Sequence, residues 1–281
     1  MFFIKKKRYS ILESGLLQGM TDCHCHILPG VDDGIQTMDE ALRALQKMTE
    51  LGVSEIWLTP HIMEDIPNTP ADLRQRFAEL NSQLSTLNSQ HSTLTPQLSL
   101  HLAAEHMLDT LFMQRLADDD LLPYEVQSVK AEANSCVPSV ASDQRSSASI
   151  FTLHSSFILV ETSYFHPPMG LYDILSGIRK KGYTLLLAHP ERYMYMDDTD
   201  YRRLRDMDVK LQLNILSLAG AYGEPAARKA HRLLHQNAYS CLGTDLHNLD
   251  DFLEYIEEKC LTKEEVTLMD TLSIVQDGRH G

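Results

Sequence analysis

The sequence predicts an α/β protein whose parallel strands close into a barrel, and three observations lead to this fold class. Seven short apolar runs typical of strands recur along the 281 residues. Between most of them lie longer amphipathic stretches typical of helices, and this alternation favours a parallel sheet with crossover helices. Seven such units come close to the eight strand–helix units of the common α/β barrel.

The expected elements follow one another without a break in composition. The stretch 38–52, MDEALRALQKMTELG, has the apolar spacing of a helix and ends in Gly52, a suitable C-cap. We therefore expect a single domain over residues 20–281, preceded by an N-terminal extension, residues 1–19. The expected strands are 20–26, 55–61, 98–105, 155–162, 183–190, 209–215 and 239–247.

Two segments interrupt this rhythm. Residues 81–97 are polar and repetitive, and we expect them to finish a helix and then to turn at Pro96. Residues 125–149 are rich in serine and alanine and have no clear period, so we expect an inserted surface loop. Neither segment predicts a domain boundary.

The composition limits the class of protein. The formal net charge of −14 disfavours general binding of nucleic acid, because an acidic chain repels phosphate backbones. The five cysteines are odd in number and show no disulfide framework, which fits a reducing compartment. The basic run near the N-terminus precedes no signal-peptide core, and no window is apolar enough to span a membrane. We expect a cytoplasmic protein with no membrane insertion.

The stretch TDCHCHILPGVDDG, residues 21–34, is the densest group of possible metal ligands. In a strand, side chains two residues apart share a face, so His24 and His26 point the same way. Cys23 and Cys25 then point the other way, and we expect them to be small apolar residues packed under a helix. The spacing predicts a histidine and carboxylate site rather than a thiolate site.

Similar residues end most of the other predicted strands. Carboxyl ends of parallel strands meet at the active face of α/β barrels, so six of the seven strands deliver a possible metal ligand to one rim. This set exceeds the four ligands of one tetrahedral ion and predicts two or three ions, with manganese, iron or zinc favoured over calcium. Beyond the first strand, the residues are His61, Glu105, Glu161, His189, Asp245 and His247.

The ordered motifs DCHCHILPGVDDG, TPH, AAEHMLD, VET, AHPERY and GTDLHNL resemble the PHP (polymerase and histidinol phosphatase) superfamily. They are most similar to its bacterial tyrosine-protein phosphatase branch, which is associated with capsule and exopolysaccharide regulation. The resemblance runs from about residue 20 to about residue 250. It implies a distorted seven-stranded (β/α)7 TIM-like barrel of the PHP type, three metal ions, and a single PHP phosphatase domain.

The resemblance also implies roles for individual residues. Asp33 would hold an ion, although Asp32 stands beside it, and Arg192 of HPER would bind the substrate phosphate. Some relatives carry another arginine after DLHNL, whereas DLHNLDDFLEY has none. The implied ion sets are His24, His26, Glu105 and Asp245 for the first ion, Glu105, Glu161 and His189 for the second, and Asp33, His61 and His247 for the third.

The function that follows from the resemblance is metal-dependent hydrolysis of phosphotyrosine. The partner would be a phosphotyrosine-bearing protein, namely a bacterial tyrosine kinase that controls capsular or exopolysaccharide synthesis. A cysteine phosphatase is disfavoured, because no cysteine has an arginine five residues after it. His166 is a further candidate for substrate binding, with an ordinary loop histidine as its alternative. Three other functions stay open: a small-molecule phosphatase such as histidinol phosphatase, an amidohydrolase-like enzyme, and a non-catalytic metal-binding module.

Overall fold

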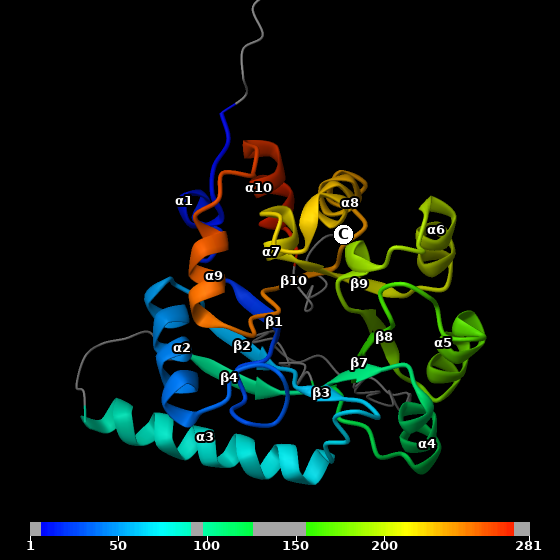
Figure 1. Ribbon diagram of the computed structural model, residues 1–281, viewed down its shortest axis with the longest axis horizontal. Coiled ribbons are helices and arrows are strands. Elements are labelled where there is room, and N and C mark those ends of the chain that lie inside the picture. The colour runs from blue at the N-terminus through cyan, green and yellow to red at the C-terminus, as the bar shows by residue number, and fades with distance from the viewer. Residues whose placement is uncertain (1–6, 91–97, 126–155, 273–281) are drawn as a thin grey trace, which may run out of the picture.

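The computed structural model describes residues 7–90, 98–125 and 156–272. Helices surround a central curled sheet (Figure 1). The helices are α1 (Ile11–Ser14), α2 (Met38–Glu50), α3 (Pro70–Gln90), α4 (Thr110–Asp118), α5 (Leu171–Lys180), α6 (Asp198–Asp206), α7 (Ile215–Leu218), α8 (Gly223–His235), α9 (Leu249–Ile256) and α10 (Lys263–Met269), with a 3-10 turn η1 (Pro190–Arg192). The strands are β1 (Thr21–Cys25), β2 (Glu55–Leu58), β3 (His61–Ile62), β4 (Ser99–Leu102), β5 (Glu105–Met107), β6 (Tyr124–Glu125), β7 (Ser156–Glu161), β8 (Thr184–Leu187), β9 (Lys210–Asn214) and β10 (Cys241–Gly243).

The sheet is parallel except at one short edge, as the strand–helix alternation predicts. One set of strands has the order β1-β2-β4, and a second has the order β10-β9-β8-β7-β5-β3. Only β6 runs antiparallel, along β7, among the paired strands of the described chain. The fold class is therefore confirmed as a mixed α/β fold with a curled parallel sheet, and each of the seven predicted runs contains a strand.

The two sets of strands continue one another. Leu58 of β2 lies opposite Leu102 of β4, and His61 of β3 lies opposite Glu105 of β5, so the register is the same on both sides of the break. The amide of Glu105 donates to the carbonyl of Pro60 across this break at 3.1 Å. The interruption brings His61 and Glu105 side by side at the carboxyl ends of their strands.

The first strand also meets the last one. The amide of His26 donates to the carbonyl of Leu246 at 2.9 Å, and the amide of Asp245 donates to the carbonyl of His24 at 2.7 Å. Cys25 and Leu246 form an isolated parallel bridge. These bonds hold the segment after β10 against the end of β1, so residues far apart in the sequence share one end of the sheet.

Helix α2 begins where its sequence predicts but ends two residues before Gly52, with Leu51 as its C-cap. Thr37 and Glu40 form a capping box that satisfies the first amides of the helix. The helix ends at Glu50, and Gly52 adopts a positive φ of 97°, a conformation that glycine reaches without a steric penalty. The helix expected to finish within 81–97 is α3, which ends at Gln90, and Pro96 lies outside the described residues.

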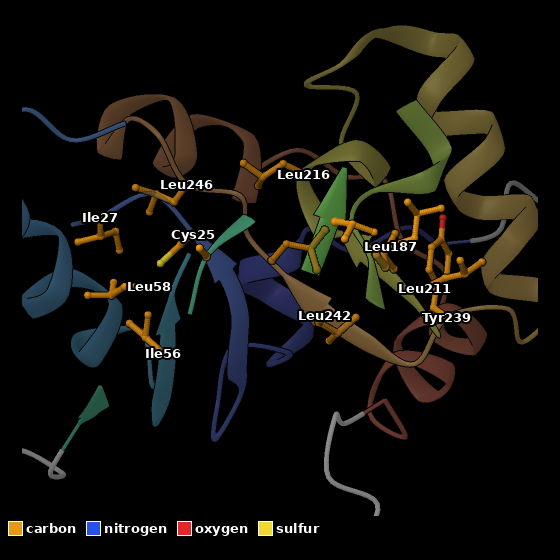
Figure 2. Close-up of a cluster of buried hydrophobic side chains, with 14 of the residues drawn as sticks. Cys25, Ile27, Ile56, Leu58, Leu187, Leu211, Leu216, Tyr239, Leu242 and Leu246 are labelled. Carbon is orange, nitrogen blue, oxygen red and sulfur yellow. The ribbon is translucent and has the colours of Figure 1, made fainter. Parts of the chain in front are cut away.

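The core has two parts, and this corrects the placement of one cysteine. Cys25 packs with the apolar faces of the outer helices, as predicted, and Figure 2 shows it close to Ile56 and Leu58. Cys23 instead lies in a second cluster, among Trp57 and Tyr124 and other side chains of the strands. The reason is a register shift in β1 between Asp22 and Cys25, which breaks strict alternation.

The described part of the N-terminal extension packs against the C-terminal helices. The amide of Tyr9 donates to the carbonyl of Leu261 at 2.8 Å, and Ile11 is fully buried. The inserted loop expected over 125–149 lies outside the described residues except for Glu125. Within the described ranges, no helix combines the length and the apolar character that crossing a membrane requires.

Candidate metal centre

The first predicted ion set forms a compact, buried group at the carboxyl ends of the strands. His24, His26, Glu105 and Asp245 each offer one ligand atom, and these atoms lie within 4.8 Å of one another. The Nε2 atom of His24 lies 3.1 Å from Glu105 Oε2 and 3.5 Å from Asp245 Oδ1. The His26 Nε2 atom lies 3.1 Å from that of His24. This spacing suits ligands that surround one cation.

The third predicted set also comes together. Asp33 Oδ1 lies 3.5 Å from His61 Nε2 and 3.5 Å from His247 Nε2, and His26 belongs to the same group. Asp33 is the most exposed member, whereas its neighbour Asp32 is turned toward the protein. The geometry therefore favours Asp33 over Asp32 as a ligand.

The second predicted set does not form a single compact group with the members that the resemblance implied. His189 Nε2 lies 2.9 Å from Glu105 Oε1, but the compact group around Glu161 contains His61 and Glu105. His61 Nδ1 lies 3.1 Å from Glu161 Oε1 and 3.2 Å from Glu105 Oε2. His61 thus faces two groups through its two ring nitrogens. Because a neutral imidazole has one lone pair, His61 can serve only one of these groups at a time.

Hydrogen bonds fix which ring nitrogen of three histidines faces the site. Gln212 Oε1 accepts the backbone N–H of His189 at 3.1 Å, which shows that this atom is an acceptor. The same oxygen lies 3.0 Å from His24 Nδ1, so His24 Nδ1 must be the donor in that hydrogen bond. His26 Nδ1 donates to Asp32 Oδ2 at 2.8 Å. His247 Nδ1 donates to the backbone carbonyl of Asp245 at 2.9 Å. When these rings are neutral, as metal ligands are, Nε2 is therefore the lone-pair nitrogen of each.

The donor set fits divalent cations. Both carboxylate oxygens of Glu105, one of Glu161 and the Nδ1 atoms of His61 and His189 are buried and lack a hydrogen-bond partner among the described residues. Buried polar atoms of this kind are rare without a ligand. Burial lowers the pKa of His24, but the Glu105 and Asp245 carboxylates outweigh it and raise that pKa to about 9. The carboxylates thus favour positive charge at this place, which metal ions would supply.

Arg192 lies beside the first group, as the resemblance implies. Its Nη1 atom donates to Asp245 Oδ2 at 2.6 Å, and its side chain is 15% exposed. The turn that carries it, η1, directly follows His189. The arginine can therefore reach a ligand that binds next to the first ion set.

The other substrate-binding candidate, His166, lies exposed in the loop after β7, and the described residues give it no hydrogen bond or ion pair. It belongs to none of the three ligand groups. Tyr193, which follows Arg192 in the chain, is fully buried. The hydroxyl group of Tyr193 accepts the amide N–H of Thr162 at 3.3 Å.

Sequence reasoning missed the contribution of the sixth predicted strand. β9 carries Gln212 and Asn214, which are two residues apart and share one face. Gln212 holds His24 and His189, and Asn214 Nδ2 donates to Asp245 Oδ2 at 2.9 Å. The signal was present in VKLQLNI, where two amides interrupt an apolar run, but amides are not typical metal ligands.

Two of the predicted ligands have an unusual backbone. His189 has a φ of 30° and Asp245 a φ of 52°, both in the left-handed region. Non-glycine residues in this region cost roughly 1–3 kcal/mol each. At these two positions the backbone turns sharply after a strand, and the turn directs the side chain toward the other ligands.

We expect Gly243→Ala to disturb the first ion set. A Cβ atom at this position would lie 2.6 Å from His24 Cβ and 2.6 Å from Gln212 Nε2, so both side chains would have to move. The expected result is a loss of bound metal and a fall in the free energy of unfolding of about 1–3 kcal/mol, typical of overpacking. Metal analysis and thermal unfolding measure the two effects.

The matched control is Gly177→Ala in α5, where an added Cβ atom meets nothing within 4 Å. Alanine in a helix interior is about 0.5–1 kcal/mol more favourable than glycine, so this variant should keep its metal and gain stability. A Gly243→Ala protein with the metal content of the Gly177→Ala protein would contradict the steric argument.

Comparisons with known proteins point to one family. A family model described as "Capsular polysaccharide synthesis, CpsB/CapC" matches residues 20–128 and 139–264. Tyrosine-protein phosphatase YwqE of Bacillus subtilis (strain 168) is 24% identical over 237 residues, 82% of this chain and 78% of that protein. Tyrosine-protein phosphatase CpsB of Streptococcus pneumoniae is 24% identical over 247 residues, 85% of this chain and 87% of that protein.

A solved structure shows the same fold. It comes from a study of YwqE and CpsB that describes them as unique metal-dependent tyrosine phosphatases. Its TM-score is 0.63 at 23% identity, and the match covers 91% of this chain and 96% of that chain. The match therefore extends over nearly all of both chains.

Proposed function

The chain belongs to the capsular polysaccharide synthesis CpsB/CapC family, and from this membership we propose that it is a metal-dependent protein-tyrosine phosphatase. The observation that carries the proposal is the metal centre itself. Three groups of histidines and carboxylates share members at one end of the sheet, and Arg192 lies beside them. The proposed substrate is a phosphotyrosine-bearing bacterial tyrosine kinase that controls capsular or exopolysaccharide synthesis, and the family description supports this choice.

We propose that three ions of manganese, iron or zinc bind to these groups. The close approach of His189 to Glu105 supports placing His189 with Glu105 and Glu161, while His61 serves the group of Asp33 and His247. Glu105 would then contact two ions through its two oxygens. The first ion is assigned to the group His24, His26, Glu105 and Asp245.

The protein side chains have separate tasks in hydrolysis. Divalent ions, when bound, supply charge for the phosphoryl oxygens and make water a nucleophile near neutral pH. Arg192 offers planar N–H donors that match two oxygens of a phosphate. Gln212 and Asp32 keep the His24 and His26 rings oriented, because each accepts a hydrogen bond from the nitrogen that points away from the site. A tyrosine leaving group needs little help from an acid, because its pKa is only about 10.

Exposed apolar side chains near the site support a polypeptide substrate. Phe165, Met169 and Met194 are 69%, 97% and 55% exposed, and they are three of the five large exposed hydrophobic residues of the described chain. They lie in the loops that follow β7 and β8, and the amide of Met194 joins these loops by donating to the Tyr164 carbonyl at 2.7 Å. Apolar surface beside a phosphate site suits a peptide that extends past its phosphotyrosine better than a small phosphate ester.

The test of the proposed function compares a phosphotyrosine peptide with histidinol phosphate, each with added manganese, iron or zinc and with a chelator. We expect hydrolysis of the peptide only with metal, and a kcat/KM for histidinol phosphate at least about 100-fold lower. The preference follows because histidinol phosphate has an alkyl leaving group and cannot contact the apolar loops. Metal-loaded protein that cleaves no phosphoester, or that prefers histidinol phosphate, would contradict the proposal.

We propose in addition that the seven strand positions form a closed, distorted barrel within a single domain over residues 20–281. The bonds between the end of β1 and the segment after β10 support this closure. The proposed compartment is the cytoplasm, where free thiols persist, and Cys23, Cys25, Cys241 and Cys260 are free.

A further inference from the structure

The two carboxylate oxygens of Asp245 have different surroundings. Oδ1 faces the histidines of the first ion set, at 3.3 Å from His26 Nε2. Oδ2 faces away from them and accepts three hydrogen bonds: from Arg192 Nη1 at 2.6 Å, from Asn214 Nδ2 at 2.9 Å and from the Tyr222 hydroxyl at 3.1 Å. One oxygen is thus available to a metal ion, while the other is fully occupied by donors from the protein.

The Arg192 guanidinium group packs against two tyrosine rings. Its central carbon is 4.4 Å from the centre of the Tyr164 ring and 3.9 Å from the centre of the Tyr222 ring. Stacking of this kind stabilises a guanidinium group and restrains its plane. Asp245 is the one hydrogen-bond partner of the Arg192 side chain within the described ranges, so most of the five guanidinium N–H donors remain available to a ligand.

We propose that Arg192 moves from Asp245 to the substrate phosphate, and that Tyr222 and Asn214 are positioning residues that make this transfer possible. A buried carboxylate oxygen that loses its sole donor pays a large desolvation penalty. Here two neutral donors stay on Asp245 Oδ2 when Arg192 leaves, while the tyrosine rings keep the guanidinium plane in place. The inference rests on the proposed function, because it requires a phosphoester beside the first ion set.

Tyr222→Phe tests the transfer, because it keeps the ring and removes the hydroxyl group. With one donor fewer on Asp245 Oδ2, Arg192 is held more tightly and is less available to phosphate. We expect the dissociation constant for inorganic phosphate and the KM for a phosphotyrosine peptide to rise about fivefold to tenfold, the value of one such hydrogen bond. We expect a smaller change in kcat and no change in metal content.

Tyr172→Phe is the matched control. The Tyr172 hydroxyl donates to Asp200 Oδ1 at 2.6 Å, and the guanidinium carbon of Arg203 lies 3.5 Å from the centre of the Tyr172 ring. A tyrosine, an aspartate and an arginine thus meet on α5 and α6, as they do at Asp245. These helices lie in the outer layer (Figure 1). A surface change of this kind should leave the phosphate affinity within about twofold of the wild type.

Calorimetric titration of metal-loaded protein with inorganic phosphate, steady-state kinetics and metal analysis give separate readouts. The inference is overturned if Tyr222→Phe binds phosphate as Tyr172→Phe does, or if its loss of affinity follows a loss of metal. Tyr164→Leu tests the stacking independently, and it too should weaken phosphate binding at full metal content; an unchanged affinity would contradict the role of the rings. If the wild type binds phosphate but hydrolyses no phosphoester, the proposed function fails while the titration still tests the transfer.

Discussion

Glu105→Gln is expected to lower kcat/KM by about a thousandfold or more, which corresponds to about 4 kcal/mol of transition-state stabilisation. Glu105 is fully buried and belongs to two of the three ligand groups. The amide nitrogen of glutamine cannot ligate a cation, and its remaining oxygen carries no charge, so this single change removes one ligand atom and weakens the other. Metal analysis should show that ions are lost as well as activity.

The matched control for this variant is Glu55→Gln. Glu55 also lies in a strand and also contacts a histidine, because His101 Nε2 lies 2.9 Å from its Oε1 atom. It is not a member of any of the ligand groups. We expect full metal content and a kcat/KM within about twofold of the wild type, as for a surface substitution. Glu105→Gln protein that keeps all its ions and its turnover would refute the proposed role of Glu105 as a shared ligand.

Arg192→Ala is expected to keep its metal ions and to lose turnover. Asp245 Oδ2 still accepts hydrogen bonds from Asn214 and Tyr222, so the ligand oxygen of Asp245 should stay in place. The substrate phosphate loses a planar, charged donor, and we expect kcat/KM to fall about 100-fold to 1000-fold. Arg192→Lys should recover only part of this loss, because an ammonium group cannot make two parallel hydrogen bonds.

Arg203→Ala serves as the control for Arg192→Ala, since Arg203 also stacks on a tyrosine ring but lies on the outer helix α6. Steady-state kinetics and metal analysis of the two variants separate loss of phosphate binding from loss of metal. Loss of ions from the Arg192→Ala protein would show that the arginine maintains the ligand group instead of binding substrate.

The sequence predicts the strand positions and most of the site because both depend on short-range patterns. An apolar run followed by a histidine or a carboxylate marks the carboxyl end of a strand, and parallel strands bring those ends together. His24 and Asp245 meet for this reason although they are 221 positions apart in the chain. The choice of Asp33 rested on the resemblance, and the structure brings Asp33 close to His61 and His247.

Other features depend on contacts that spacing does not determine. Cys23 enters the interior of the sheet because of a local register shift in β1, which strict alternation cannot foresee. Tyr164 and Tyr222 reach Arg192 from two loops, and loop conformation follows from tertiary packing. The order in which the strands pair could not be predicted for a similar reason. Two of the predicted strands are each divided, by a break after Leu58 and by a break after Leu102, and the resulting pieces belong to two sets of paired strands.

The positive φ angles of His189 and Asp245 lower the stability of the fold at two positions that the proposed activity requires. Glycine at either position would relax the backbone and remove a proposed metal ligand. Directed evolution for heat resistance alone would therefore favour variants that have lost the reaction. A screen for more thermostable variants should therefore select for turnover in every round. It should also leave the codons for His189 and Asp245 unchanged.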